Sequence, residues 1–178
     1  MTTASAPTGS TPEAAASPRR NPWAQTFLSP VPIAFAIGTL GTAVLGAVLA
    51  AFGIPGLAGW QAWLTGGLSL MFLISASGRL QPKVRAGLVA MVPPGVPNPG
   101  LVVAATGVLE AAGAIGLLLP PTHRAAAICL ALLLIAVFPA NVRAARLGER
   151  LGGLFSPLLP RTVEQVVWIA ACVAVAIG

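Results

Sequence analysis

The chain has 178 residues, of which 56% are hydrophobic and only 8% are charged. Soluble domains carry charge on roughly 25% of their residues, so this composition excludes a soluble enzyme and a disordered chain and indicates an integral membrane protein. The ten basic and four acidic residues give a formal charge of +6, but no basic cluster is interleaved with aromatic residues, so nucleic acid is not an expected partner.

Residues 1–31 are rich in Ala, Ser, Thr and Pro. They are predicted to form a disordered cytoplasmic tail, because they cannot bury enough apolar surface to offset the entropy of ordering. Residues 32–178 are predicted to form one transmembrane helical domain, since a bilayer core is crossed by about 20 apolar residues in a helix. Five stretches meet or approach that length: 33–52, 57–77, 100–119, 124–140 and 162–178.

The basic residues predict the orientation of these five spans. If the tail is cytoplasmic, nine of the ten basic residues fall on the cytoplasmic side and only Arg124 falls outside. Cytoplasmic loops of membrane proteins carry this excess of Lys and Arg. The sequence therefore predicts a multi-pass protein of the bacterial cytoplasmic membrane, with its N-terminus inside and its C-terminus outside.

The first span has a second interpretation. Arg19 and Arg20, the apolar run and the small residues of VLAAFG also fit a cleaved signal peptide. The apolar run is about 20 residues long, which exceeds a usual signal core. This length favours a retained helix.

Glu110 lies near the middle of the third span. A central carboxylate costs about 3 kcal/mol on insertion scales, so its side chain is expected to face the bundle interior. Thr106, one turn earlier, shares its face and can donate a hydrogen bond to it. Glu110 is then either a proton site or hydrogen-bond partner for a quinone-like head group, or an interhelical contact that fixes packing. Glu110→Gln is expected to keep the fold.

Two helix faces carry side chains that repeat every four residues. A polar stripe on the second span either faces Glu110 across the bundle or marks a helix–helix contact; its residues are Gln61, Thr65 and Ser69. A ridge of small residues on the first span is predicted to pack closely against the bundle or a second copy of the chain; its residues are Gly38, Thr42, Gly46 and Ala50.

Two further features lie on the predicted cytoplasmic side. Residues 81–92 have apolar positions at helical spacing and are predicted to form a short amphipathic helix along the interface. The segment Phe138–Asn141 ends the fourth span, with Pro139 loosening the helix and Asn141 and Arg143 beside it. This lip either binds an anionic head group or a partner, or simply ends the helix and anchors it.

The chain has two cysteines and one histidine. A zinc site or an iron–sulfur cluster needs about four clustered ligands, so neither a metal nor a covalent cofactor is expected. A bound quinone or a partner subunit would have to carry any redox chemistry. Cys129 and Cys172 are expected at similar depth near the outer surface, as free thiols that fill apolar gaps rather than as a disulfide.

The segments TGVLEAAGAIGLLLP (106–120) and HRAAAICLALLLIAVFPANVRAA (123–145), with ISASGRL, MVPPGVP and LPRTVEQVVW, resemble the DoxX family of small bacterial membrane proteins. The resemblance covers about residues 60–178 and implies an antiparallel four-helix transmembrane bundle, with the first span as an extra helix. Where related sequences often carry a histidine after the second span, this chain reads Gly78-Arg79-Leu80-Gln81.

The resemblance implies a subunit of a membrane redox system, quinone-linked or involved in redox stress. Its expected partners are the lipid bilayer, soluble redox proteins on the cytoplasmic side, and a further copy of the chain. The alternatives are a non-catalytic scaffold that holds soluble partners at the membrane, which the lack of cofactor ligands favours, and a small transporter or proton pathway, for which Glu110 is the only support.

Overall fold

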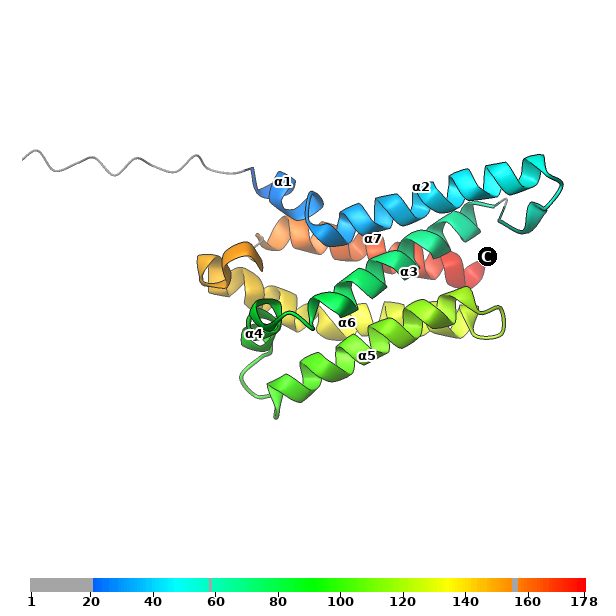
Figure 1. Ribbon diagram of the computed structural model, residues 1–178. Coiled ribbons are helices and arrows are strands. Elements are labelled where there is room, and N and C mark those ends of the chain that lie inside the picture. The colour runs from blue at the N-terminus through cyan, green and yellow to red at the C-terminus, as the bar shows by residue number, and fades with distance from the viewer. Residues whose placement is uncertain (1–20, 58, 155–156) are drawn as a thin grey trace, which may run out of the picture.

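The computed structural model describes residues 21–57, 59–154 and 157–178, and these residues form helices and short connections (Figure 1). The α-helices are α1 (Pro22–Phe27), α2 (Pro30–Ala51), α3 (Trp60–Gly78), α4 (Pro82–Met91), α5 (Pro99–Leu118), α6 (His123–Leu147) and α7 (Leu158–Ile177). Two 3-10 helices join them, η1 (Pro55–Leu57) before α3 and η2 (Gly148–Leu154) before α7.

Prolines begin α1, α2, α4 and α5. A proline fits the first turn of a helix because its fixed φ is helical and its missing N–H has no partner there anyway. The prediction of a disordered tail over residues 1–31 is wrong for its last part, since α1 and the start of α2 lie within it. The Asn21 side chain caps α1 by accepting a hydrogen bond from the Trp23 N–H at 3.0 Å. Residues 1–20 lie outside the described residues.

Four long helices pack around a common apolar core. α3 contacts α5 and α7, and α6 contacts both α5 and α7, so that the four helices close a ring. Fully buried side chains from all four helices fill its centre, among them Leu68, Phe72, Leu117, Leu130 and Val175. The short α1 packs on the start of α7.

The long helix α2 lies outside this ring and packs on α3 (Figure 1). The contact depends on glycines: a Cβ placed on Gly38 would lie 2.7 Å from the Gly66 carbonyl oxygen and 2.9 Å from the Gly67 Cα. Gly46 approaches the Leu57 backbone of η1 in the same way. The predicted packing of the small-residue ridge is therefore confirmed for Gly38, Thr42 and Gly46, whereas Ala50 at its end is exposed.

Four helices of the described chain are long and apolar enough to cross a membrane: α2, α5, α6 and α7. The protein is therefore an all-α membrane protein. α3 has 19 residues but does not reach the same apolarity. The predicted polar stripe accounts for this, because Gln61, Thr65 and Ser69 lie on α3.

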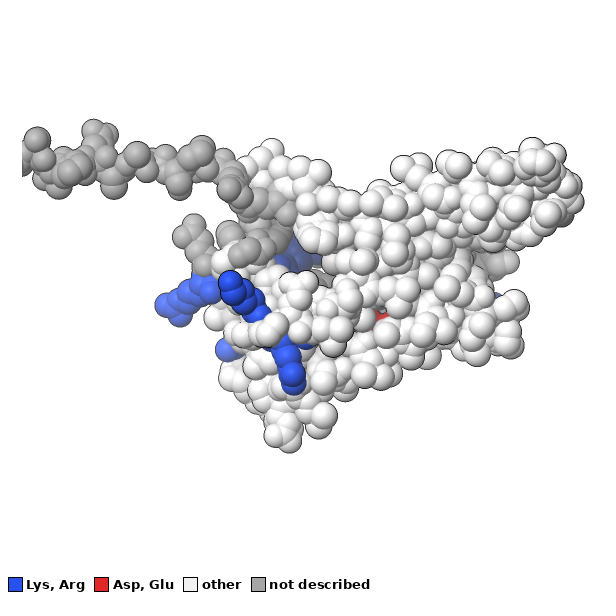
Figure 2. Space-filling model, viewed as in Figure 1, with Lys and Arg blue, Asp and Glu red and all other residues white. Residues whose placement is uncertain are grey.

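Basic side chains gather at one end of the molecule, where α4 and η2 lie (Figure 2). The helix predicted over residues 81–92 is confirmed as α4 at this end, where it contacts α5, α6 and η2. The structure places α1 at the same end, and the C-terminus lies at the opposite one (Figure 1). The ends of the described chain are thus on opposite sides of the helix bundle.

Candidate functional site

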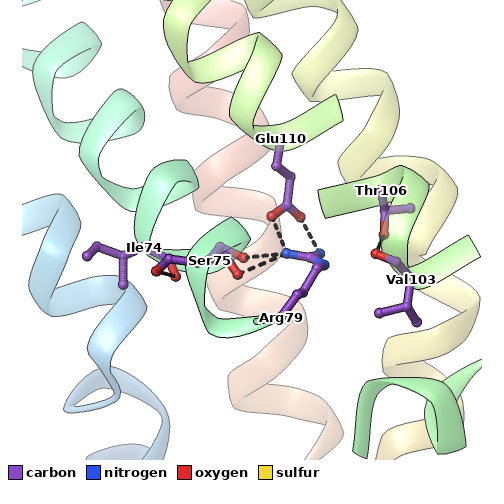
Figure 3. Close-up of polar contacts among 7 residues, drawn as sticks. Ile74, Ser75, Arg79, Val103, Thr106 and Glu110 are labelled. Carbon is purple, nitrogen blue, oxygen red and sulfur yellow. Dashed lines mark hydrogen bonds and ion pairs between the residues drawn. The ribbon is translucent and has the colours of Figure 1, made fainter. Parts of the chain in front are cut away.

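Glu110 forms an ion pair with Arg79 inside the helical domain (Figure 3). The Arg79 Nη1 lies 2.5 Å from Oε2 of the carboxylate, and Nη2 lies 2.7 Å from Oε1. The two side chains are only 14% and 8% exposed. Nη1 also donates to the Ser75 carbonyl oxygen at 3.0 Å and to the Ser75 hydroxyl at 3.3 Å. This fork-to-fork geometry is the strongest arrangement for such a pair.

Ser75 holds the Arg79 side chain by hydrogen bonds, and Gly107 leaves room for it. Arg79 caps the C-terminal end of α3, and Ser75 lies one turn before it on the same face. Gly107 of α5 lies one turn before Glu110, and a Cβ placed on it would be 2.7 Å from the Arg79 Cδ. The absence of a side chain at Gly107 therefore lets the arginine stem cross α5 and reach the carboxylate.

The predicted interior position of Glu110 is confirmed, because this side chain is buried, but Thr106 is not its hydrogen-bond partner. The Thr106 hydroxyl donates to the Val103 carbonyl oxygen of its own helix at 3.1 Å instead of to Glu110 (Figure 3). A threonine in a helix commonly bonds a carbonyl three or four residues back. Glu110 instead receives two charged donors from α3.

A second polar network joins α6 to α7. The Asn141 Nδ2 donates to the Gln165 Oε1 at 2.5 Å, and the Arg161 Nη1 donates to the Asn141 Oδ1 at 3.1 Å. Gln165 also donates to the Leu134 carbonyl oxygen, and the Arg161 Nη2 donates to the Leu154 carbonyl oxygen of η2 at 2.7 Å. Asn141 is thus the residue through which the side chains of Arg161 and Gln165 are joined.

Helix α6 itself differs from the prediction at this point. It continues to Leu147 with Pro139 inside it, whereas the fourth span is predicted to end at Ala140. A proline lacks the N–H that would bond the carbonyl four residues back, which here belongs to Ile135. Gln165 of α7 binds the neighbouring Leu134 carbonyl. A side chain of α7 therefore donates a hydrogen bond to the α6 backbone next to the place where Pro139 interrupts the hydrogen bonds of that helix.

The two polar networks line one cavity of about 290 Å³. Its polar and aromatic lining includes Arg79, Glu110, Asn141, Arg161, Glu164, Gln165 and Trp168. Glu164 is attracted by Arg161 and lies one turn before Trp168 on α7. Two arginines and two glutamates balance in formal charge here. Each arginine keeps a buried Nε without a partner among the described residues.

The polar stripe of α3 does not converge on Glu110. Gln61 and Thr65 line a separate cavity of about 620 Å³ near the start of α6, together with His123. The Thr65 hydroxyl donates to the Gln61 carbonyl oxygen at 2.7 Å, as at a helix–helix contact. The Ser69 hydroxyl is buried and has no partner among the described residues. The prediction that this stripe faces Glu110 is wrong for Gln61 and Thr65. These two residues lie near the start of α3, whereas Arg79 and its partner Glu110 meet at the other end of this helix.

The candidate lip residue Arg143 connects α6 to α4. Its Nε donates to the Ala90 carbonyl oxygen at 2.9 Å, which satisfies one of the carbonyls left open at the end of α4. Arg143 does not line the cavity of the ion pair. The structure therefore separates it from Asn141, its neighbour in the predicted lip.

Neither cysteine is among the described residues that line the cavity. In residues 21–57, 59–154 and 157–178, no three His, Cys, Asp or Glu side chains are grouped so as to hold a metal ion. Both cysteines are free; Cys129 is exposed on the surface of α6 and Cys172 is fully buried in the core.

Sequence reasoning missed Arg79, Ser75, Arg161 and Gln165 as members of the site. Arg79 and Arg161 count as orientation signals in the sequence, yet both turn their side chains inward. The available signal was that ionisable groups inside a membrane domain pair with one another, so the buried Glu110 required a basic partner. For α7 the signal was Arg161 and Gln165 at a spacing of one turn in an apolar helix.

A family model described as "Domain of unknown function (DUF8561)" matches residues 68–176. The match covers more than half of the chain and includes α5, α6 and most of α3 and α7, and the chain belongs to this family. No curated protein and no solved structure matches the chain.

Proposed function

We propose that this member of the DUF8561 family is a membrane subunit of a redox system, and that it binds a quinone-like head group in the cavity beside the Arg79–Glu110 pair. The observation that carries the proposal is the cavity itself, which gathers charged and amide side chains inside an otherwise apolar protein. The resemblance of residues 60–178 to the DoxX family supports the same function.

The cavity suits a flat, uncharged head group with oxygen acceptors. Its volume of about 290 Å³ accommodates a single ring, and its lining balances positive and negative charge. Arg161 and Asn141 offer hydrogen-bond donors, and a carbonyl oxygen of the ligand can accept from them. The Trp168 ring offers an aromatic face for stacking. When bound, a quinone would supply the electron-accepting chemistry that these side chains lack.

The protein's own residues would position this ligand. The bidentate pair holds Arg79 and Glu110 in one orientation, and the Asn141–Gln165 bond holds α6 against α7. Because these contacts fix the side chains that line the cavity, binding would require little further ordering of side chains. Soluble redox proteins would meet the subunit at the basic end.

We also propose that α2, α3, α5, α6 and α7 all cross the bilayer, as an antiparallel four-helix bundle with α2 as an extra helix. α3 is the least apolar, but it packs against α2, α5 and α7, so its polar stripe is shielded from lipid. The basic end would face the cytoplasm of a bacterial cell, with the C-terminus outside. Reporter fusions at residues 1 and 178 test this topology, and reporters on the same side would contradict it.

The binding proposal is tested on the full chain, purified in mild detergent. Organic extraction and mass spectrometry should find a retained quinone, and decylubiquinone should bind saturably to protein stripped of lipid. Ser29 lines the cavity, and its side chain makes no hydrogen bond among the described residues. Ser29→Trp should fill the cavity and abolish binding, while the matched Ser29→Ala should retain it. Absence of saturable binding, or equal binding by both variants, would refute the proposal.

A further inference from the structure

A groove at the basic end lies apart from the cavity of the ion pair. It has a volume of about 560 Å³ and runs between the loop after α4 and the last turns of α6. Pro93 and Pro94 form one wall of the groove. The other wall is a single face of α6, made of Phe138, Pro139, Val142, Arg143, Arg146 and Leu147.

This face of α6 is divided along its length. Residues three and four positions apart in a helix are neighbours on its surface, so the wall residues form one continuous stripe. Its first part, from Phe138 to Val142, is apolar and belongs to a helix that is apolar enough to span a membrane. Its second part carries the two guanidinium groups of Arg143 and Arg146. The stripe is therefore complementary to a lipid, because its apolar part can contact an acyl chain and its two arginines can contact an anionic head group.

The two arginines are available for an anion. The Arg143 Nε is fixed on the Ala90 carbonyl oxygen at 2.9 Å, which holds the guanidinium in place and leaves both terminal nitrogens without a partner among the described residues. Arg146 makes no hydrogen bond or ion pair in the described chain and is exposed. Among the side chains that the structure describes, no acidic one lines the groove. An arginine held in place in this way loses less side-chain entropy when it binds a phosphate.

We infer that this groove binds an anionic phospholipid of the surrounding membrane. Its phosphate is held between Arg143 and Arg146, and an acyl chain lies along Phe138, Pro139 and Val142. The charge of the two arginines, with no carboxylate among the described residues that line the groove, selects an anionic head group over a zwitterionic one. The apolar part of the stripe requires a lipid rather than free phosphate. This site is independent of the proposed quinone cavity.

The test uses the full chain, freed of lipid in neutral detergent and titrated with phosphatidylglycerol, phosphatidylcholine or inorganic phosphate. Binding is measured by native mass spectrometry. Arg146→Gln removes one phosphate contact without breaking any bond of the described structure. Its matched control is Arg124→Gln at the other end of α6, which removes the same charge from an exposed position outside the groove. A basic residue near a membrane surface is worth about 1 kcal/mol, which corresponds to about fivefold in affinity.

Phosphatidylglycerol should bind the wild type more tightly than phosphatidylcholine, and inorganic phosphate should not compete with it. Arg146→Gln should weaken phosphatidylglycerol binding about fivefold, and Arg124→Gln should leave it unchanged. Arg146→Lys should retain most of it, which separates loss of charge from misfolding. Equal binding of the two lipids, competition by inorganic phosphate, or equal losses in Arg146→Gln and Arg124→Gln would overturn the inference.

Discussion

The Arg79–Glu110 pair should be essential to stability as a pair but replaceable as a unit. Glu110→Gln leaves the Arg79 guanidinium, which is 14% exposed, without its counter-charge. Arg79→Met likewise leaves the Glu110 carboxylate, which is 8% exposed, without its counter-charge. Each single variant should therefore be unstable, in contrast to the expectation from sequence that Glu110→Gln keeps the fold.

The magnitudes follow from the burial of the pair. Breaking a buried ion pair by removing one partner costs about 3–5 kcal/mol, whereas replacing both partners with apolar residues is often neutral or stabilising. The double variant Arg79→Met/Glu110→Met should therefore lie within about 2 kcal/mol of the wild type. If each single loss is at least about 3 kcal/mol, the two losses fail to add in the double variant by about 4 kcal/mol or more.

The assay is equilibrium unfolding in mixed detergent–SDS micelles, followed by circular dichroism for the wild type, both single variants and the double variant. Thr106→Val is the control on the same helix as Glu110, because among the described residues its hydroxyl bonds only the Val103 carbonyl of α5. It should change the free energy of unfolding by no more than about 0.5 kcal/mol. Stability of Glu110→Gln equal to that of the wild type, or additive losses in the double variant, would refute the pairing argument.

Two further predictions concern packing. Gly38→Leu should destabilise the α2–α3 contact by about 1–3 kcal/mol through overpacking, because its Cβ alone would lie 2.7 Å from the Gly66 carbonyl oxygen. Gly41→Leu, where nothing lies within 4 Å of the added Cβ, should be neutral or slightly stabilising, and the same unfolding assay compares the two; equal losses would show that the crossing is loose. Cys129, which is exposed, should react with a membrane-permeant maleimide in the folded protein, whereas Cys172 should react only after unfolding. Intact mass with and without reductant measures both reactions, and a loss of two daltons in the oxidised form would reveal a disulfide instead.

The sequence alone determined the properties that depend on the free energy of moving one segment or one side chain from water into an apolar environment. Composition and apolar run length identified a helical membrane protein and placed α2, α3, α5 and α7 to within a few residues of their bounds. The cost of a carboxylate in an apolar span placed Glu110 in the interior, and the spacing of small residues identified the α2 contact through Gly38. Each of these follows from one segment of chain and its surroundings, with no knowledge of its neighbours.

Only the tertiary structure decided which polar groups meet. The partner of Glu110 is Arg79, because the rotation of α3 about its axis and the open surface at Gly107 bring a long side chain to α5. The Asn141–Gln165 bond likewise depends on how α6 and α7 face each other. Helical periodicity tells which residues share a face, but the rotation and axial offset of one helix against another are set by the packing of all the helices together. For that reason Gln61 and Thr65, on the helix that Arg79 caps, lie at a different cavity.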